Sequence, residues 1–226
     1  MVTCSVTSFL NAASAPPLRT GHTANLLGDE IIIVGGMCDG ECTSEVLVVH
    51  AETGAWRSIR PNGTAEPKPR LGHATCTGPR YDDASKSQLW LFGGGDGRLL
   101  LNDLWTLERG GDASGSSDGW RWVGRSTSGK ATGRMGHSLV HLPSKGCLLS
   151  FGGFVKGIKG GYATQVLLLE LSTLTWSEPT ILPRPSPTIQ PIRGRLGQCA
   201  CVLGDGHAVL LFGGSAGLEL LNDVIL

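Results

Sequence analysis

The sequence has no long apolar run and no excess of charge of either sign. None of its uninterrupted apolar segments approaches the ~20 residues needed to cross a bilayer, so we expect no transmembrane helix. Lys plus Arg and Asp plus Glu number 19 each, so the net charge provides no general attraction to nucleic acid or to an anionic membrane. Seven cysteines are an odd number that matches no disulfide framework. We therefore expect an intracellular protein, cytoplasmic or nuclear, without a nucleic-acid or membrane partner.

Tyrosine is scarce and glycine is abundant. The chain holds two tyrosines but 34 glycines among 226 residues, and that glycine content is about twice the usual ~7%. Apolar residues make up 40% of the sequence, which is enough to form a core and argues against disorder. The glycines lack the three-residue period of collagen, so their positions have another cause.

Paired glycines end four apolar runs at nearly equal intervals. The first glycines of successive pairs are 58, 59 and 61 residues apart, and the pairs are Gly35-Gly36, Gly93-Gly94, Gly152-Gly153 and Gly213-Gly214. An Arg-x-Gly-His motif precedes each pair and begins at Arg19, Arg70, Arg134 and Arg195, with Gln198 in place of the last histidine. A tryptophan follows the first three pairs, at Trp56, Trp122 and Trp176. This recurring order indicates an internal repeat.

Each copy has the pattern of a small antiparallel sheet. A short semi-apolar stretch such as 23–27 breaks at a turn signal, here Gly28-Asp29, and an almost wholly apolar run follows. The glycine pair ends that run, a third apolar run comes next, and a polar turn leads to the tryptophan strand. Four strands in about 60 residues, without helical periodicity, are typical of a β-propeller blade.

The ordered motifs resemble the kelch repeat over residues 19–226. The sequence departs from that pattern at Val49 and Leu169, where kelch repeats usually carry tyrosine, and in the Gly-, Ser- and Asp-rich insertion 110–119. The resemblance implies an all-β, kelch-type β-propeller of four-stranded antiparallel blades. We place the repeats at about 19–69, 70–133, 134–194 and 195–226, the last one truncated before its tryptophan strand.

The predicted ring is incomplete, with three full blades and most of a fourth. Kelch propellers commonly have five to seven blades, and propellers in general about four to eight. Residues 1–18 form an N-terminal segment in which 3–9 alternates weakly, as an outer or closing strand would. We expect a piece of a larger propeller rather than an arc completed by partner chains, because an open arc exposes a β-edge and an apolar face.

Several motifs suggest chemistry, but each has a structural explanation. Gly213 to Gly217 spell Gly-x-Ser-x-Gly without a later histidine, and Gly93 to Gly97 lack the helix that a phosphate loop needs. The equivalent histidines (His22, His73 and His137) recur by blade, as a structural role requires, and the cysteine pairs (Cys38 with Cys42, Cys199 with Cys201) lack a matching second pair. We therefore predict no catalytic residue, no metal and no cofactor.

The resemblance leaves an enzyme as the alternative function. Some kelch-like propellers are copper oxidases with a tyrosine–cysteine cofactor, and others are specifier proteins of glucosinolate breakdown. Only Tyr81 and Tyr162 are present, both in expected loops, so the copper-radical site has little support. A site shared among blades outside this chain stays open as the second function.

The four repeated arginines are the first candidate binding residues. The resemblance implies that Arg19, Arg70, Arg134 and Arg195 lie near the mouth of the central channel, where some family members hold carboxylate-bearing peptides. A guanidinium binds a carboxylate through two parallel hydrogen bonds, and several at one rim would focus positive potential. The alternative is that each arginine pairs with an acid or carbonyl of its own blade.

The loops after the glycine pairs are the second candidate. They differ most among the copies, and the third, 154–162, mixes apolar, basic and flexible residues, including Phe154, Lys156 and Lys159. Variable loops on a rigid repeat scaffold are a common means of partner recognition, and a solvated loop without a partner is the alternative. The predicted function is a non-catalytic scaffold or adaptor that binds a protein or an acidic, carboxylate-bearing peptide.

Overall fold

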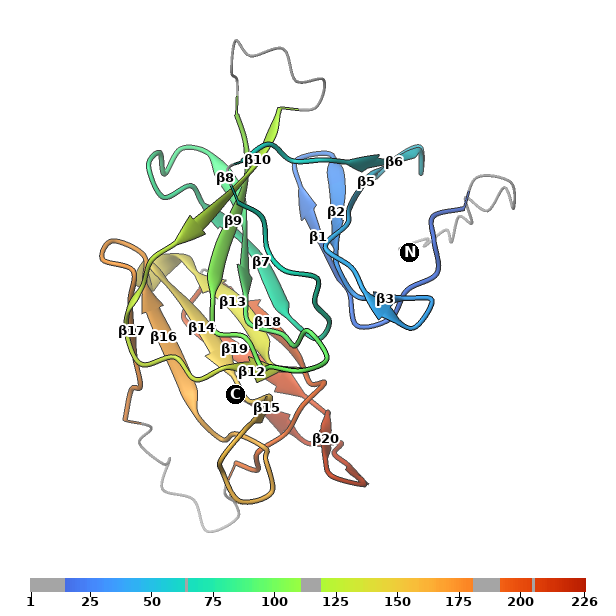
Figure 1. Cartoon of the computed structure of the whole chain (residues 1–226). Coiled ribbons are helices and arrows are strands. Elements are labelled where there is room, and N and C mark those ends of the chain that lie inside the picture. The colour runs from blue at the N-terminus through green and yellow to red at the C-terminus, as the bar shows by residue number, and fades with distance from the viewer. Residues whose placement is uncertain (1–14, 64, 111–118, 181–191, 205) are drawn as a thin grey trace, which may run out of the picture.

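The computed structural model describes residues 15–63, 65–110, 119–180, 192–204 and 206–226. Within these ranges the chain is all-β, without an α-helix, and its main strands form four antiparallel sheets in sequence order (Figure 1). The weakly alternating stretch 3–9 and most of the insertion 110–119 lie outside the described residues. The predicted all-β propeller of antiparallel blades is therefore confirmed.

The first two blades each have four strands in the order predicted from the repeat. Blade 1 consists of β1 (Thr23–Leu27), β2 (Glu30–Val34), β5 (Val46–His50) and β6 (Trp56–Ile59). Blade 2 consists of β7 (Ala74–Pro79), β8 (Ser87–Phe92), β9 (Leu104–Arg109) and β10 (Trp120–Arg125).

Blades 3 and 4 continue the series. Blade 3 consists of β13 (Ser138–Leu142), β14 (Cys147–Phe151), β16 (Val166–Glu170) and β17 (Thr175–Ser177), with the short β11 (Ser128–Gly129) added in parallel to β17. A single 3₁₀ turn, Pro143–Lys145, joins β13 to β14. Blade 4 has three strands, β18 (Cys199–Leu203), β19 (Ala208–Phe212) and β22 (Val224–Ile225).

Short strands occupy one end of the blades. They are β3 (Met37–Cys38), β4 (Glu41–Cys42), β12 (Arg134–Met135), β15 (Phe154–Val155), β20 (Ser215–Ala216) and β21 (Glu219–Leu220). The labelled members of this set, β3, β12, β15 and β20, lie in the lower half of the molecule in Figure 1. This end faces away from the β9–β10 hairpin at the top of the same view.

The three tryptophans of the repeat lie on the fourth strands. Trp56 pairs with Val49, Trp122 with Leu107 and Trp176 with Leu169, so they occupy the same register in their blades. Trp122 and Trp176 are 4% and 3% exposed because they pack on the apolar residues of the neighbouring blade.

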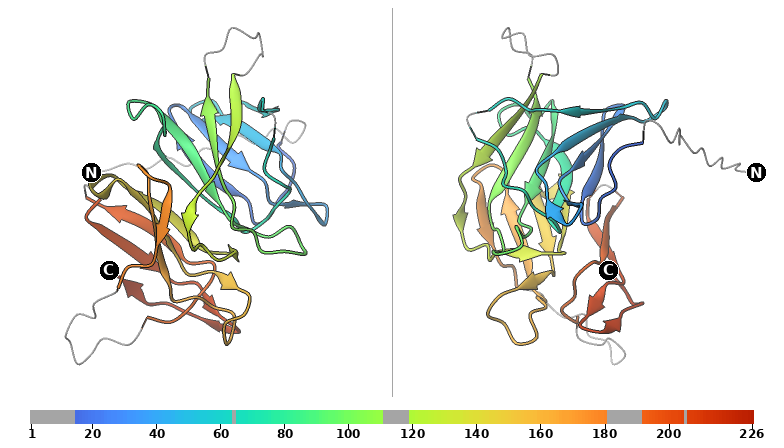
Figure 2. Two further views of the ribbon diagram at one scale, coloured as in Figure 1. Left: turned by 60° about the vertical axis from the view of Figure 1, so that its left-hand side comes forward. Right: turned by 45° about the vertical axis from the view of Figure 1, so that its right-hand side comes forward.

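The core lies between the blades. One apolar cluster joins blades 1 and 2, a second joins blades 2 and 3, and a smaller third joins blades 3 and 4. The first strands of neighbouring blades, β1, β7, β13 and β18, pack against one another in that order around the centre. In both views of Figure 2 the blue first blade and the red fourth blade are the two ends of the series.

Candidate functional site

The Arg-x-Gly turns of the four blades meet at the end that carries the short strands. Gly72 donates its N–H to the Gly21 carbonyl at 2.9 Å, Gly136 to Gly72 at 2.7 Å, and Gly197 to Gly136 at 2.8 Å. All four glycines have φ between +61° and +70°, a backbone conformation that other residues rarely adopt. These hydrogen bonds join the turns of the four blades into one continuous floor at this end of the molecule, which we call the mouth.

The loops that follow the glycine pairs stand on this floor. Each one pairs with the Arg-x-Gly turn of its own blade through a short antiparallel bridge: Thr20 with Met37, Leu71 with Gly95, Met135 with Phe154, and Leu196 with Ser215. The four unlike loops are therefore held side by side at one mouth, as Figure 1 shows for β3, β15 and β20.

These loops expose apolar side chains that sequence reasoning named only in part. Phe154 is 38% exposed and Ile158 is 41% exposed in the third loop. The second and fourth loops add three exposed leucines, Leu99, Leu218 and Leu220. The sequence could have indicated these exposed residues, because each is an apolar residue within a Gly-rich turn, where no strand or helix would bury it.

The third loop has a defined shape and a positive charge. Phe154 contacts Tyr162 edge to face, with ring centroids 6.0 Å apart, and Gly161 lies under the Phe154 ring, where a Cβ atom would come within 2.2 Å of it. Lys156 and Lys159 are exposed, and residues 154–162 include no Asp or Glu. The loop therefore presents exposed apolar side chains next to two exposed cations.

The structure places the repeated arginines inside their own blades. Arg70 and Arg195 are 1% and 0% exposed. Arg70 donates to both oxygens of Asp103 at 2.7 and 2.8 Å and to the Gly93 carbonyl at 2.9 Å. Arg195 binds Asp223 and the Gly213 carbonyl in the same way.

Arg19 and Arg134 repeat this geometry with other partners. Arg19 donates to Glu45 at 2.6 Å and to the Gly35 carbonyl at 3.2 Å. Arg134 donates to the Gly152 carbonyl at 3.1 Å, but an amide, that of Gln165, replaces the carboxylate. Burial lowers the pKa of Arg134 to about 10, and Glu178 acts in the opposite direction.

The four guanidinium groups therefore fix the end of the second strand in each blade, which is the structural alternative left open by the sequence. Their donors point to carbonyls and acids of the same blade, and the side chain of Arg19 is only 4% exposed. A partner at the mouth would meet the loops above them instead. Arginines and loops are thus two layers of one end of the propeller.

The repeated histidines are spacers between blades and do not converge. His73 and His137 are 4% and 6% exposed, and each ring lies against the first glycine of the preceding blade's pair, Gly35 or Gly93. Burial, with a neighbouring arginine as the second cause, lowers the pKa of each to about 3. No group of three or more His, Cys, Asp or Glu that could hold a metal ion occurs among the described residues.

The first strands line a groove at the centre that sequence reasoning did not identify. It encloses about 350 Å³, and its polar lining includes Asn25, Thr75, Thr77, His141 and Cys201. Asn25 and Thr75 are hydrogen-bonded to each other, and burial lowers the pKa of His141. These residues lie two to four positions after the repeated His or Gln of their blades, which places them on equivalent strands but does not show that these strands pack side by side.

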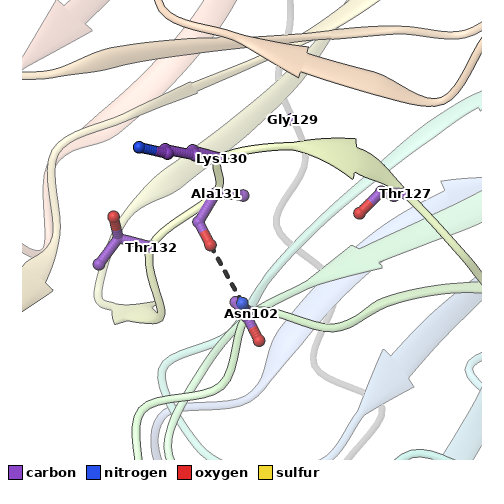
Figure 3. A pocket seen from close by; sticks show the side chains of 6 residues that line it. All are labelled: Asn102, Thr127, Gly129, Lys130, Ala131 and Thr132. Carbon is purple, nitrogen blue, oxygen red and sulfur yellow. Dashed lines mark hydrogen bonds between the residues drawn. The ribbon is translucent and has the colours of Figure 1, made fainter.

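A second hollow of about 400 Å³ lies where the chain passes from blade 2 to blade 3. Figure 3 shows Asn102, whose side-chain amide donates to the Ala131 carbonyl at 3.1 Å, beside Thr127, Lys130 and Thr132. This lining has hydroxyl, amide and ammonium groups and no carboxylate or imidazole, so it offers hydrogen bonds but no acid–base pair.

Comparison with known proteins agrees with this geometry. A family model described as the KLHDC2/KLHL20/DRC7 Kelch-repeats domain matches residues 21–226. The chain belongs to the kelch-repeat family. The resemblance expected from the motifs is confirmed, and with it a domain type that typically serves as a protein-interaction scaffold.

Several curated relatives contain this kelch-repeat region within longer chains. Adagio-like protein 1 of Oryza sativa subsp. japonica is 32% identical over 96% of the chain, and putative adagio-like protein 2 of the same species is 34% identical over 91%. These matches cover 34% and 32% of the two rice proteins, so the chain spans about a third of their length. Dynein regulatory complex subunit 7 of Chlamydomonas reinhardtii is 32% identical over 50% of the chain and 9% of its own length.

Proposed function

We propose that this kelch propeller is a non-catalytic scaffold that binds a protein segment at the mouth formed by the four loops. The observation that carries the proposal is the convergence of four unlike loops on one hydrogen-bonded floor of turn glycines. A rigid floor reduces the conformational entropy that is lost on binding, and the differences among the four loops provide specificity.

The third loop defines the chemistry of the partner. Phe154 and Ile158 offer apolar contact area, and Lys156 with Lys159 offers positive charge beside it. The preferred partner is therefore a peptide or loop that carries apolar and acidic side chains. Carboxylate recognition is assigned to the lysines of the loop, because the guanidinium groups beneath them are engaged within their blades.

The free cysteine thiols and the name of one relative support an intracellular partner. The six described cysteines are all free thiols, as in a reducing compartment. Among the relatives, a subunit of the dynein regulatory complex is by its name part of an assembly. No described helix is long and apolar enough to span a membrane.

A peptide library tests the function and its location together. We expect the wild-type chain to select peptides enriched in Asp or Glu next to apolar residues, and their affinity to fall with rising salt. The double variant Lys156→Glu with Lys159→Glu is expected to weaken these peptides at least about tenfold, or ~1.4 kcal/mol, in isothermal titration calorimetry.

Lys145→Glu is the matched control, because Lys145 is also exposed and lies in the 3₁₀ turn at the opposite end of the same blade. This variant should bind like the wild type, and all variants should melt at the wild-type temperature. Selection of peptides without acidic residues, or an equal loss of affinity in Lys145→Glu, would contradict the proposal.

A further inference from the structure

The hollow of about 400 Å³ between blades 2 and 3 is formed mainly by the connecting segment 126–133 (Figure 3). The fold anchors this segment near both ends. Near its start, Ser128 donates its N–H to the Leu174 carbonyl at 3.0 Å. Just after its end, Arg134 donates its N–H to the Leu101 carbonyl at 3.2 Å. The wall of the hollow is therefore fixed in place by both neighbouring blades.

The backbone groups of this segment are used unevenly. The Ala131 carbonyl accepts a hydrogen bond from the Asn102 side chain at 3.1 Å. The Thr132 carbonyl accepts one from Arg134 Nε at 3.2 Å. The N–H groups of Ala131, Thr132 and Gly133 have no hydrogen-bond partner among the described residues. At Ala131 and Thr132 the acceptors are therefore engaged by the protein, whereas the donors remain for a ligand.

The side chains of the segment add donors of other kinds. Thr127, Lys130 and Thr132 line the hollow, and all three are exposed. In Figure 3 the Lys130 ammonium and the Thr132 hydroxyl point to the same side of the segment. The hollow thus combines one positive charge with hydroxyl and backbone donors.

Two acidic residues adjoin the lining of this hollow. Asp103 is engaged by Arg70 through both carboxylate oxygens, at 2.7 and 2.8 Å. Glu178 is exposed. Strand β11 pairs in parallel with β17, and two residues beyond this pairing Ala131 and Glu178 lie at matching positions. Glu178 is therefore the carboxylate that opposes an anion at this place.

We propose that this hollow binds a phosphate group. Ammonium, hydroxyl and backbone N–H donors around an open space suit a tetrahedral oxyanion, which accepts hydrogen bonds from several directions. A carboxylate is matched better by the planar fork of an arginine, and no guanidinium group is part of the described lining.

The position of the hollow favours a phosphorylated side chain over a free phosphate. Strand β12 follows the segment directly and pairs with β15, with Arg134 opposite Val155. One step beyond that pair, Gly133 and Lys156 of the third loop lie at matching positions. We therefore assign the phosphate to a phosphorylated Ser or Thr of the segment that the loops bind. This source rests on the proposed function, whereas the phosphate site itself does not.

Titration of inorganic phosphate into the isotope-labelled chain, followed by heteronuclear NMR, tests the site without a partner. The N–H signals of Ala131, Thr132 and Gly133 should shift together, with a Kd of about 1 mM or tighter. Acetate at the same pH should bind at least about tenfold more weakly, because it accepts fewer hydrogen bonds and carries less charge.

Single substitutions at exposed side chains identify the groups that bind phosphate. Lys130→Met should weaken phosphate binding at least about tenfold and Thr132→Val about threefold, since each removes a donor. Glu178→Gln should strengthen it about twofold, because it removes the opposing charge. Lys145→Met is the matched control: Lys145 is an exposed lysine at the opposite end of the same blade, and its loss should leave the Kd unchanged.

A phosphopeptide series distinguishes the two sources. Phosphoserine is placed in turn at each position of the peptide that the library selects. One position should gain at least about tenfold in affinity, and Lys130→Met should remove that gain. If inorganic phosphate binds but no phosphopeptide gains affinity, the site stands and the assignment to a phosphorylated side chain is overturned.

The phosphate site and the proposed function fail by different results. Shifts scattered over the surface, equal binding of acetate, or an unchanged Kd in Lys130→Met overturn the phosphate site. A library that selects no peptide overturns the proposed function, and with it the phosphorylated side chain as the source, while the titration with inorganic phosphate still decides the site.

Discussion

At the scale of single residues, each repeated residue has the same structural role in every blade where it occurs. The arginine holds the glycine pair of its own blade, and the histidine fills the space against the glycine pair of the preceding blade. Gln198 takes the histidine position in blade 4, is 7% exposed, and donates to the Phe151 carbonyl at 2.8 Å. Because an amide occupies the same space without titrating, this position tests what the imidazole contributes.

Acid is expected to destabilise the fold through His73 and His137. Both have a folded-state pKa of about 3, lowered mainly by burial, so they stay neutral when folded. The unfolded chain binds protons below pH ~6.5, so the stability from these groups is complete above that pH and falls as pH decreases toward 3. Each histidine should cost about 2 kcal/mol between pH 7.5 and pH 5.

Urea unfolding at these two pH values measures this loss. The double variant His73→Gln with His137→Gln should have a shallower dependence on pH, because glutamine does not titrate. An unchanged slope between pH 7.5 and 5 in that variant would assign the acid sensitivity to other groups. His22 is a suitable comparison, since it is exposed. Partial burial and Arg19 lower the pKa of His22 as well, so His22→Gln should alter the slope in the same direction but less than the double variant.

At the scale of the element, the second glycine of each pair packs tightly against the Arg-x-Gly-His turn of its own blade. Gly94 has φ +98°, and a Cβ atom there would lie 2.9 Å from the His73 Cβ and 3.0 Å from the Leu71 carbonyl. Gly97, three residues later, has φ +86° but nothing within 4 Å of the same atom. Comparing the stability of an alanine substitution at each of the two glycines therefore distinguishes the cost of backbone strain from the cost of steric overlap.

Gly94→Ala should destabilise the chain more than Gly97→Ala. The Gly97 change carries only the cost of a positive φ, about 1–2 kcal/mol. The Gly94 change adds overlap with the backbone and the histidine, and we expect a total of at least about 3 kcal/mol. Chemical denaturation of both variants measures the difference, and equal losses would show that the packing of Gly94 on Leu71 and His73 relaxes around the added methyl group.

At the scale of the whole molecule, stability should vary along the series of blades. The strands β8 and β14 of the middle blades are covered on both sides, whereas β19 of blade 4 is covered on one. A repeat protein draws much of its stability from contacts with neighbouring repeats, so an uncovered blade opens more readily.

Hydrogen exchange measured by mass spectrometry should show this gradient. We expect β8 and β14 to exchange at least about tenfold more slowly than β19, because covered strands open with a larger free energy. Equal protection of β14 and β19 would mean that the packing of blade 4 on blade 3 is enough to hold β19 closed.

The repeat register alone was sufficient to predict the blades. Glycine pairs, the Arg-x-Gly turns and the tryptophans located the strands because turn glycines and buried runs are local features that recur in each copy. Of the candidate site, the sequence indicated the third loop and its lysines. It did not indicate the central groove, because Asn25 and His141 become neighbours only when the first strands pack together.

Thus the amino-acid sequence by itself determined the blade, its four-strand order and its membership of the kelch-repeat family. The tertiary structure decided which way each repeated residue faces. Arg70 serves its own blade, because Asp103 and the Gly93 carbonyl lie within reach of its guanidinium. His22 and Phe212 stay exposed, although their counterparts are buried, because burial depends on a neighbouring blade and not on the residue type.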